Sequence, residues 1–255
     1  MQVTVLQTSD QSDYLPIFNA TSRTAREFCR RQALAYEGFV GVKRGLWSWH
    51  STYNRIYMIK ELLDGGYNGW LIYMDADAYI HNLDFPIAGY LATYQTLAGI
   101  FVRVSGLAPY WDVNAGVFLL NAGHPLTRKL VETWIAGHES VFARQEFLTD
   151  AWPDIDLRID DQGLLNEMLI ANPEWQFSLH YESQALINSM HASFLRHHMR
   201  AHTPDLAQRT TAIAGDVEDI LSKAAAKDAV GSLPVPRISS VAHLRKLWPA
   251  RKMRD

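Results

Sequence analysis

The chain has 255 residues, of which 48% are hydrophobic and 20% are charged. This length and composition predict one large α/β domain, alone or with appendages. The net charge of −3 is too close to neutral for electrostatic binding of nucleic acid. The single cysteine, Cys29, excludes an internal disulfide, and we expect it to be a small buried residue on a helix in a reducing compartment.

No apolar run approaches the length of a membrane span. The first residues also lack the basic segment that opens a signal peptide. We therefore expect a cytoplasmic protein, or a peripheral protein on the inner face of the membrane.

The first predicted element is a strand over residues 3–7. A polar turn at residues 8–10 follows its carboxyl end, and α/β domains that open in this way often bind a nucleotide there. A plain transition from strand to loop explains the same residues. A helix is expected over residues 15–35, and a glycine-rich loop over residues 36–47.

A second helix is predicted to begin at a cap formed by His50 and Ser51 and to end at Gly65. Its apolar residues recur at the spacing of an amphipathic helix. Arg55 and Lys60 lie within it, and either cation could contact a phosphate. Each is more commonly a solvated helix residue.

Five apolar residues, 70–74, run directly into Asp75 and Asp77. This run predicts a buried strand of a mostly parallel sheet, and open α/β sheets bind ligands at such carboxyl ends. Side chains two residues apart on an extended chain point the same way, so the two carboxylates repel unless a cation lies between them. A hard divalent ion satisfies this arrangement. A solvated turn is the alternative, and the spacing alone does not decide between them.

The middle of the chain contains a second distinctive stretch. A modest helix is expected within residues 82–96, followed by a strand over residues 97–102. Another strand occupies the latter half of residues 111–121. The Asn-Ala-Gly sequence at 114–116 precedes it, and its glycine indicates that the backbone closely approaches another group.

Two further helices are predicted. The first runs from Pro125 to a stop at Gly137. The second opens at Asp160, and acidic residues at a helix start are favoured by capping and by the helix dipole. Asp160 therefore requires no function, and Asp161 and Gln162 become interesting only together with the earlier motifs.

A final strand is expected over residues 175–179, followed by a segment rich in histidine and arginine. Histidine is the commonest nitrogen ligand of metals, so this segment could complete a site begun by two carboxylates. A basic, partly exposed helix is the alternative. The histidines of the segment are His191, His197, His198 and His202.

The composition changes after residue 203. A surface helix is predicted over residues 216–229, a linker over residues 231–236 and a basic tail over residues 244–254. The tail could lie on an anionic membrane surface, where each basic residue contributes about 1 kcal/mol. A frayed terminus is the alternative.

Three motifs now occur in order: Asp75-Ala76-Asp77 after an apolar strand, the Asn-Ala-Gly sequence at 114–116, and Asp161-Gln162 at a helix start. In this order and spacing the chain resembles GT-A glycosyltransferases, and in particular the galactosyltransferase family of the yeast Gma12/Mnn10 type and its bacterial relatives. The resemblance covers residues 1–202. It implies an α/β fold with a Rossmann-like, mostly parallel central sheet flanked by helices, and it leaves residues 203–255 as a helical extension with a basic tail.

The resemblance also implies a metal site. Asp75 and Asp77 would bind Mn²⁺ or Mg²⁺, which bridges the two phosphates of a nucleotide sugar, expected to be a UDP-sugar. A late histidine would complete the metal shell. His191 is the expected ligand, and His198 is the second choice.

The donor and catalytic residues follow from the same resemblance. The first turn would hold the base and ribose, Arg55 would be a second cation for the diphosphate, and the backbone at 114–116 would lie against the donor sugar. Asp161 and Gln162 are assigned to donor-sugar binding or catalysis without a choice between them. The expected donor contacts are Thr8, Ser9, Asp10, Tyr14, Arg55, Asp75, Asn114, Ala115 and Gly116.

The expected activity is metal-dependent transfer of a hexose, with retention, to a glycan or lipid-linked acceptor in polysaccharide biosynthesis. Residues 104–112 and 145–158 are the expected acceptor loops. A non-catalytic sugar-nucleotide or glycan-binding module of the same fold is one alternative. A haloacid-dehalogenase-like phosphatase is another, but its Asp-x-Asp motif belongs on the first strand and is followed by Thr or Val, whereas Ala78 and Tyr79 follow here.

Overall fold

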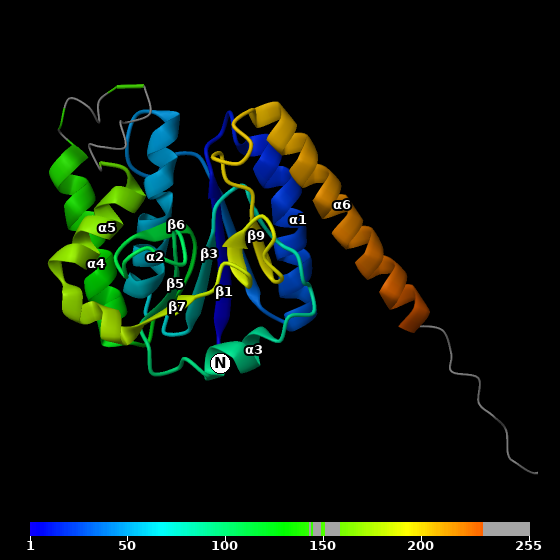
Figure 1. Ribbon diagram of the computed structural model, residues 1–255, viewed down its shortest axis with the longest axis horizontal. Coiled ribbons are helices and arrows are strands. Elements are labelled where there is room, and N and C mark those ends of the chain that lie inside the picture. Colours follow the sequence, from blue (N-terminus) through cyan, green and yellow to red (C-terminus); the bar gives the residue numbers. More distant parts are fainter. Residues whose placement is uncertain (143, 145–148, 151–158, 232–255) are drawn as a thin grey trace, which may run out of the picture. The chain divides into compact units, whose positions relative to one another are not determined.

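The computed structural model describes residues 1–142, 144, 149–150 and 159–231 (Figure 1). One compact unit comprises Met1–Leu221, and a second begins at Ser222. Gly231, the first residue of the linker predicted over residues 231–236, is the last residue of the helix at Leu206–Gly231. The rest of that linker and the basic tail lie outside the described residues, and so does most of the second expected acceptor loop. Among the described helices, none is both long enough and apolar enough to cross a membrane.

The centre of the first unit is a six-stranded sheet with the order β2-β1-β3-β6-β5-β7. Only β6 runs against the others, because it pairs antiparallel with both β3 and β5 while the remaining pairs are parallel. The predicted mostly parallel central sheet is therefore confirmed. Its strands are β1 (Val3–Ser9), β2 (Ala35–Val40), β3 (Trp70–Met74), β5 (Gly99–Arg103), β6 (Val113–Asn121) and β7 (Leu179–Glu182).

Helices cover both faces of this sheet, with α2, α4 and α5 on one side and α1 on the other (Figure 1). The α-helices are α1 (Leu15–Gln32), α2 (Asn54–Asp64), α3 (Ile87–Ala92), α4 (Pro125–Phe142), α5 (Asp161–Ala171) and α6 (Leu206–Gly231). Two 3₁₀ helices, η1 (Ser48–Tyr53) and η4 (Pro173–Ser178), precede α2 and β7. Cys29 is buried on α1, as expected.

Several sequence-based boundaries are wrong, and a local reason explains three of them. Residues 35–40 form β2 rather than a loop, because a half-exposed edge strand tolerates polar residues and glycine. The helix α4 continues through Gly137, because the glycine keeps a helical backbone there; a Cβ at this position would meet Leu164 of α5 only at ordinary contact distance. Residues 173–178 form η4 and not a strand, since Pro173 suits the first turn of a helix.

The register of β3 fixes where the site forms. All five residues of β3 are buried, and Met74 at its end pairs with Gln7 of β1 and Val117 of β6. The backbone N–H of Asp75 then donates to the carbonyl of Gly116 at 2.8 Å. The carboxyl ends of β1 and β3 therefore meet the start of β6 at one edge of the sheet.

A second, three-stranded sheet has the order β4-β9-β8 and stands beside that edge. Its strands are β4 (Ala78–Ile80), β8 (Ile187–Ser189) and β9 (Leu195–His197). β4 follows directly after the two aspartates, and its antiparallel register pairs Ala78 with His197. This pairing brings the histidine-rich segment, which is strand and turn rather than helix, to the end of β3.

Stacked aromatic rings connect the core to the site. Phe101 of β5 stacks on Phe118 of β6 with ring centroids 5.4 Å apart, and Phe118 stacks on Tyr73 of β3 at 5.1 Å. Trp134 of α4 packs against Phe118 from the helical layer, at 5.9 Å. Tyr73 is the last ring in this row and lies two residues before Asp75. The stacking therefore holds its hydroxyl rigidly beside the site.

Candidate metal centre

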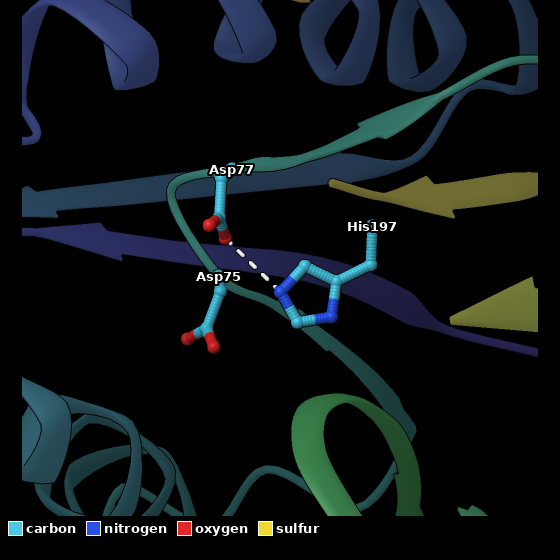
Figure 2. Close-up of side chains that lie close together, drawn as sticks. All are labelled: Asp75, Asp77 and His197. Atoms are coloured by element: carbon cyan, nitrogen blue, oxygen red, sulfur yellow. Dashed lines mark hydrogen bonds and ion pairs between the residues drawn. The ribbon is translucent and has the colours of Figure 1, made fainter. Parts of the chain in front are cut away.

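Asp75, Asp77 and His197 converge at the carboxyl end of β3 (Figure 2). Each offers one ligand atom, and these atoms all lie within 4.8 Å of one another. The Nε2 atom of His197 lies 3.0 Å from Oδ1 of Asp77. Two carboxylates and an imidazole at these separations form a donor set that can hold a divalent ion such as manganese.

Asn188 fixes the orientation of His197. Its Oδ1 lies 2.7 Å from Nδ1 of the imidazole, and its Nδ2 donates to Oδ1 of Asn114 at 3.1 Å. Because an amide oxygen only accepts, Nδ1 of His197 carries the hydrogen. Nε2 is therefore the nitrogen that faces the carboxylates, and it is the one available to a metal. Asn188 itself has φ of 67°, a left-handed conformation that asparagine tolerates.

Gly116 explains why the Asn-Ala-Gly sequence belongs to this site. A Cβ atom at this position would lie 2.1 Å from Cε1 of His197 and 2.7 Å from its Nδ1. No side chain fits there, so the imidazole packs directly on the β6 backbone. Asn114 Oδ1 accepts from the Gly116 N–H at 2.8 Å and shapes the same turn.

Asp75 is held from the side of the main sheet. Its Oδ1 accepts from Nη2 of Arg55 at 2.6 Å and from the hydroxyl of Tyr73 at 2.8 Å. Thr8 of β1 is hydrogen-bonded to that same tyrosine hydroxyl at 2.8 Å. Among the described residues both side-chain contacts of Asp75 end on Oδ1, so Oδ2 keeps its lone pairs for a cation.

Arg55 is buried, and each of its three guanidinium nitrogens donates a hydrogen bond to the protein. Its Nε donates to the carbonyl of Thr52 at 2.8 Å, and its Nη1 donates to the carbonyl of Ala115. Its Cζ lies 4.7 Å from the centroid of the Tyr73 ring. Nη1 also lies 3.1 Å from Oδ2 of Asp161. These contacts favour a role in binding two carboxylates over the direct diphosphate contact expected from the sequence.

Burial determines the protonation of the two carboxylates bound by Arg55. Burial raises the pKa of Asp161 to about 7, although Arg55 opposes this change. Burial also raises the pKa of Asp75, again against Arg55. Arg55 is thus a single cation placed between two carboxylates, and its charge does not offset the effect of burial on either pKa.

The Asp77–His197 pair behaves differently. Burial acts to raise the pKa of Asp77, but the imidazole outweighs it and the net shift is downward. Burial likewise acts to lower the pKa of His197, and Asp77 outweighs it so that the net shift is upward. In the absence of a metal the two groups therefore form an ion pair, and a divalent ion would take the place of the Nε2 proton.

The structure does not bring His191 to the aspartates. His191 is exposed in the turn between β8 and β9, and His197 takes the expected position because β9 pairs with β4. His198 is not the ligand either, since its Nε2 is hydrogen-bonded to Thr203 Oγ1 at 2.9 Å. Neighbouring side chains of a strand point to opposite faces, so only one of two adjacent histidines can face the carboxylates. His197, and not His191 or His198, is the histidine that the structure places beside the two aspartates.

The predicted nucleotide turn lies at the end of β1, beside the carboxylates, but the side chains of Thr8 and Asp10 are hydrogen-bonded to the protein. Asp10 Oδ1 accepts from the backbone N–H groups of Ser12 at 2.7 Å and Tyr14 at 3.3 Å, which stabilises the start of α1. Ser9 Oγ is buried and has no hydrogen-bond partner among the described residues. Backbone groups and Ser9 are thus the atoms of this turn best placed for a nucleotide.

Arg209 of α6 is a site residue that the sequence analysis missed. Only 1% of its surface is exposed, and its Nε lies 3.9 Å from Oδ2 of Asp77. Its Nη2 donates to the hydroxyl of Tyr14 at 2.7 Å, and its Nη1 donates to the carbonyl of Thr203 at 3.2 Å. The surface helix is predicted only from residue 216, whereas α6 begins at Leu206, so the sequence gives no signal for a buried arginine at 209. The first part of α6 belongs to the same compact unit as the aspartates.

Gln162 connects α5 to β6. Its Oε1 accepts from the backbone N–H of Ala115 at 3.1 Å, next to Gly116. Asp161 lies beside it at the start of the helix, with its side chain turned toward Arg55 and only 6% exposed. The three sequence motifs are therefore adjacent in space, and Arg55, Asn188, His197 and Arg209 complete their surroundings.

A comparison of the sequence with protein families and with curated proteins finds no match. Solved structures give several. A glycosyltransferase involved in the glycosylation of the major capsid of PBCV-1 matches with a TM-score of 0.59 and 11% identity, over 84% of this chain and 98% of that chain. The galactosyltransferase LgtC, in complex with donor and acceptor sugar analogues, matches with a TM-score of 0.46 and 13% identity, over 83% and 95% of the two chains.

A Drosophila β1,4-galactosyltransferase 7 in complex with manganese, UDP-Gal and xylobiose matches with a TM-score of 0.41 and 12% identity, over 79% of this chain and 73% of that chain. These structural neighbours are glycosyltransferases of the GT-A type. The likeness to the PBCV-1 enzyme is the one on which the fold assignment rests. The chain has the GT-A fold, and its Asp-Asp-His cluster could bind a metal at the edge of the central sheet.

Proposed function

We propose that the protein is a metal-dependent glycosyltransferase that transfers a hexose from a nucleotide-diphosphate sugar to a glycan or lipid-linked acceptor. One observation carries this proposal: Asp75, Asp77 and His197 converge at the carboxyl end of β3 in a GT-A fold. Fold alone does not define function, so the proposal depends on the chemistry of these three side chains.

The three side chains suit Mn²⁺ or Mg²⁺. Carboxylate oxygens and one neutral imidazole form a hard to intermediate donor set, which manganese accepts readily. The close packing of His197 on Gly116 keeps Nε2 directed at the carboxylates. A bound divalent ion would supply a Lewis acid for the diphosphate of the donor.

The proposed reaction forms a bond between an acceptor hydroxyl oxygen and the anomeric carbon. The bond from that carbon to the diphosphate breaks, its electron pair leaves with the diphosphate, and the hydroxyl proton passes to an oxygen of that leaving group. The residues of this chain mainly bind and orient the substrates. The backbone at Asn114–Gly116 would lie along the donor sugar, and the amide nitrogen of Gln162 would donate to a sugar hydroxyl.

In this proposal Asp161 acts on the site indirectly, through Arg55. Its carboxylate is buried behind Arg55, and Arg55 in turn binds Asp75. We infer that Asp161 positions Arg55 and does not itself touch the sugar. The turn at residues 8–10 and Tyr14 remain the proposed location of the base and ribose.

Finer features of the proposal rest on the sequence resemblance. They are a UDP-sugar as donor, retention of anomeric configuration, membership of the Gma12/Mnn10-type galactosyltransferases, and a role in polysaccharide biosynthesis. The domain boundary at residue 202 and peripheral membrane contact through the basic tail also stay predictions.

Calorimetry of UDP binding tests the metal role. Wild-type protein should bind UDP with manganese present and lose that affinity in chelator, because the metal joins the diphosphate to the carboxylates. Asp77→Asn should bind UDP equally weakly with and without manganese. The matched control is Asp84→Asn, a change at an exposed aspartate outside the site, which should leave manganese-dependent binding intact.

A second measurement separates an enzyme from a binding module. Wild-type protein with manganese should hydrolyse at least one member of a panel of UDP-sugars, since water can replace the acceptor. Manganese-dependent UDP binding without turnover of any sugar nucleotide, with or without added glycans, would favour the non-catalytic module.

A further inference from the structure

A cavity of about 430 Å³ lies where β5 and β7 end, apart from the metal centre. Ligand sites for small molecules measure about 300–1,000 Å³, so the cavity has room for one or two sugar rings. Its lining residues come from the loops that follow the two strands. They include Arg103, Ser105, Gly106, Tyr181, Glu182 and Gln184.

Hydrogen bonds join the walls of this cavity. Gln184, which follows β7, donates through Nε2 to the carbonyls of Arg103 and Val104 at 2.9 Å each. Arg103 at the end of β5 donates through Nη1 to the carbonyl of Ala108 at 3.0 Å. The two strand ends and the loop at residues 104–112 are thus tied together, and the cavity is formed before any ligand arrives.

The lining favours an uncharged ligand with many hydroxyl groups. Arg103 supplies N–H donors and Glu182 supplies carboxylate oxygens, so the opposite charges balance and neither a phosphate nor a free cation is preferred. The Glu182 carboxylate is held by the hydroxyl of Tyr90 and the N–H of Ser183, both at 2.7 Å. Tyr181, which also packs against the hydrophobic core, contributes an aromatic side chain to the lining. Donors, acceptors and an aromatic side chain together suit a saccharide.

The register of the sheet places this cavity relative to the metal centre. Asn114 of β6 pairs with Val102 of β5, which pairs with Glu182 of β7. Glu182 is therefore two strand spacings, about 10 Å, from Asn114, which hydrogen-bonds to Gly116 and Asn188 at the metal centre.

The order of the strands separates the two sides of that centre. β1, whose end carries the expected nucleotide turn, lies on one side of β3, and β6, β5 and β7 lie on the other. A donor bound from β1 to the metal would present its sugar toward β6. The cavity at β5 and β7 is on the side from which a second substrate can approach that sugar.

We propose that this cavity is the subsite for the acceptor, and that the acceptor presents an uncharged saccharide to it. The inference rests on the proposed glycosyltransferase function. The cavity orients the acceptor so that one of its hydroxyl groups reaches the anomeric carbon near Asn114, and the transfer step is the one written above.

The test uses the full chain and methyl glycosides of glucose, galactose and mannose as probes. Saturation-transfer NMR reports their binding, with and without UDP and manganese, and calorimetry reports UDP–manganese binding separately. Gly106→Trp places a large side chain in the lining. Gly106 has open space around its Cβ position, so the change causes no clash with the backbone. The matched control is Gly89→Trp in α3, another exposed glycine with open space.

We expect wild type and Gly89→Trp to bind at least one glycoside. Gly106→Trp should give a saturation-transfer signal at least tenfold weaker while binding UDP–manganese normally. Arg103→Met, which keeps the aliphatic stem but removes the N–H donors, should weaken glycoside binding in the same direction. Equal signals from Gly106→Trp and wild type, or no glycoside signal from wild type, would overturn the assignment. If wild type binds a glycoside but not UDP–manganese, both the acceptor role and the proposed function are overturned. If it binds UDP–manganese but no glycoside, only the acceptor assignment fails.

Discussion

The two aspartates of the metal centre lie two residues apart, yet different parts of the protein hold them. Asp75 belongs to the main sheet, where it is bound by Arg55 of α2 and by Tyr73 of its own strand. Asp77 belongs to the small sheet, where it is bound by His197 of β9 and approached by Arg209 of α6.

The two sides therefore contribute different properties: the Asp75 side makes the site rigid, and the Asp77 side supplies the third candidate metal ligand. The Asp75 side is a buried ion-pair network between core elements, and its burial raises the pKa of its carboxylates. The Asp77 side contributes the imidazole, and its carboxylate ionises easily because His197 is beside it. We infer that changes on the Asp75 side act mainly on stability, and that changes on the Asp77 side act mainly on metal affinity.

The largest expected effect is on the Asp75 side. Arg55→Met leaves Asp75 and Asp161 without their buried cation, and breaking a buried pair costs about 3–5 kcal/mol of unfolding free energy. Urea denaturation should show this loss, and it should be larger at pH 8 than at pH 5.5, where Asp161 can take up a proton. The control is Lys60→Met, in which an exposed helix cation is removed from the same helix. A loss below about 1 kcal/mol would show that the network does not hold the Asp75 side together.

The next effect is on the Asp77 side. His197→Ala should weaken manganese binding by more than about 100-fold, the upper end of what a change outside the ligand set causes. His191→Ala, a change at an exposed histidine in the adjacent turn, is the control and should leave the affinity unchanged. Calorimetric titration with manganese measures both, and the opposite ranking would return the ligand role to His191.

A smaller loss of affinity is expected from Asn188→Gly. Glycine adopts the left-handed backbone of this position without strain, so the change removes only side-chain contacts. These are the acceptor for His197 Nδ1 and the Nδ2 donor to Asn114 and Val117. Loss of such a support typically lowers metal affinity about 10- to 100-fold. Asn188→Asp keeps an acceptor oxygen at the same place and should retain most of the affinity. An equal loss in both variants would attribute the effect to the contact with Asn114 instead.

The same contrast explains how far the sequence predicts this molecule. The Asp75 side can be predicted from one short stretch of sequence, because an apolar run ending in carboxylates predicts a buried strand and a site at its end. The Asn-Ala-Gly sequence adds a prediction of close approach, which the packing of His197 on Gly116 confirms. These features depend on the local chain and on the general rules of α/β sheets.

The Asp77 side depends on pairing between segments about 120 residues apart, and the sequence alone does not provide it. Nothing in the histidine-rich segment shows that β9 pairs with β4 with Ala78 opposite His197, and a shift of one residue would present a different side chain. Arg209 is missed for the same reason, since its burial follows from where α6 lies against Tyr14 and Thr203.

The last expected effect is the pH dependence of the Asp75 side. Burial raises the pKa of Asp161 to about 7, above the ordinary value of an aspartate in an unfolded chain, with Arg55 opposing the change. Between those two values the folded protein holds a proton that the unfolded chain has released. Stability therefore falls as pH rises, by at most about 1.4 kcal/mol for each pH unit, and it levels off above pH 7.

Asp161→Asn removes this titration while preserving the size of the side chain. Urea unfolding of both proteins from pH 5 to pH 8 should give a wild-type curve that declines relative to the variant up to about pH 7 and then runs parallel to it, because all other titrations are shared. Parallel curves over the whole range would mean that Arg55 keeps Asp161 ionised throughout. The buried pair would then be a fixed charge network, and the difference between the two aspartates would lie only in which element binds each of them.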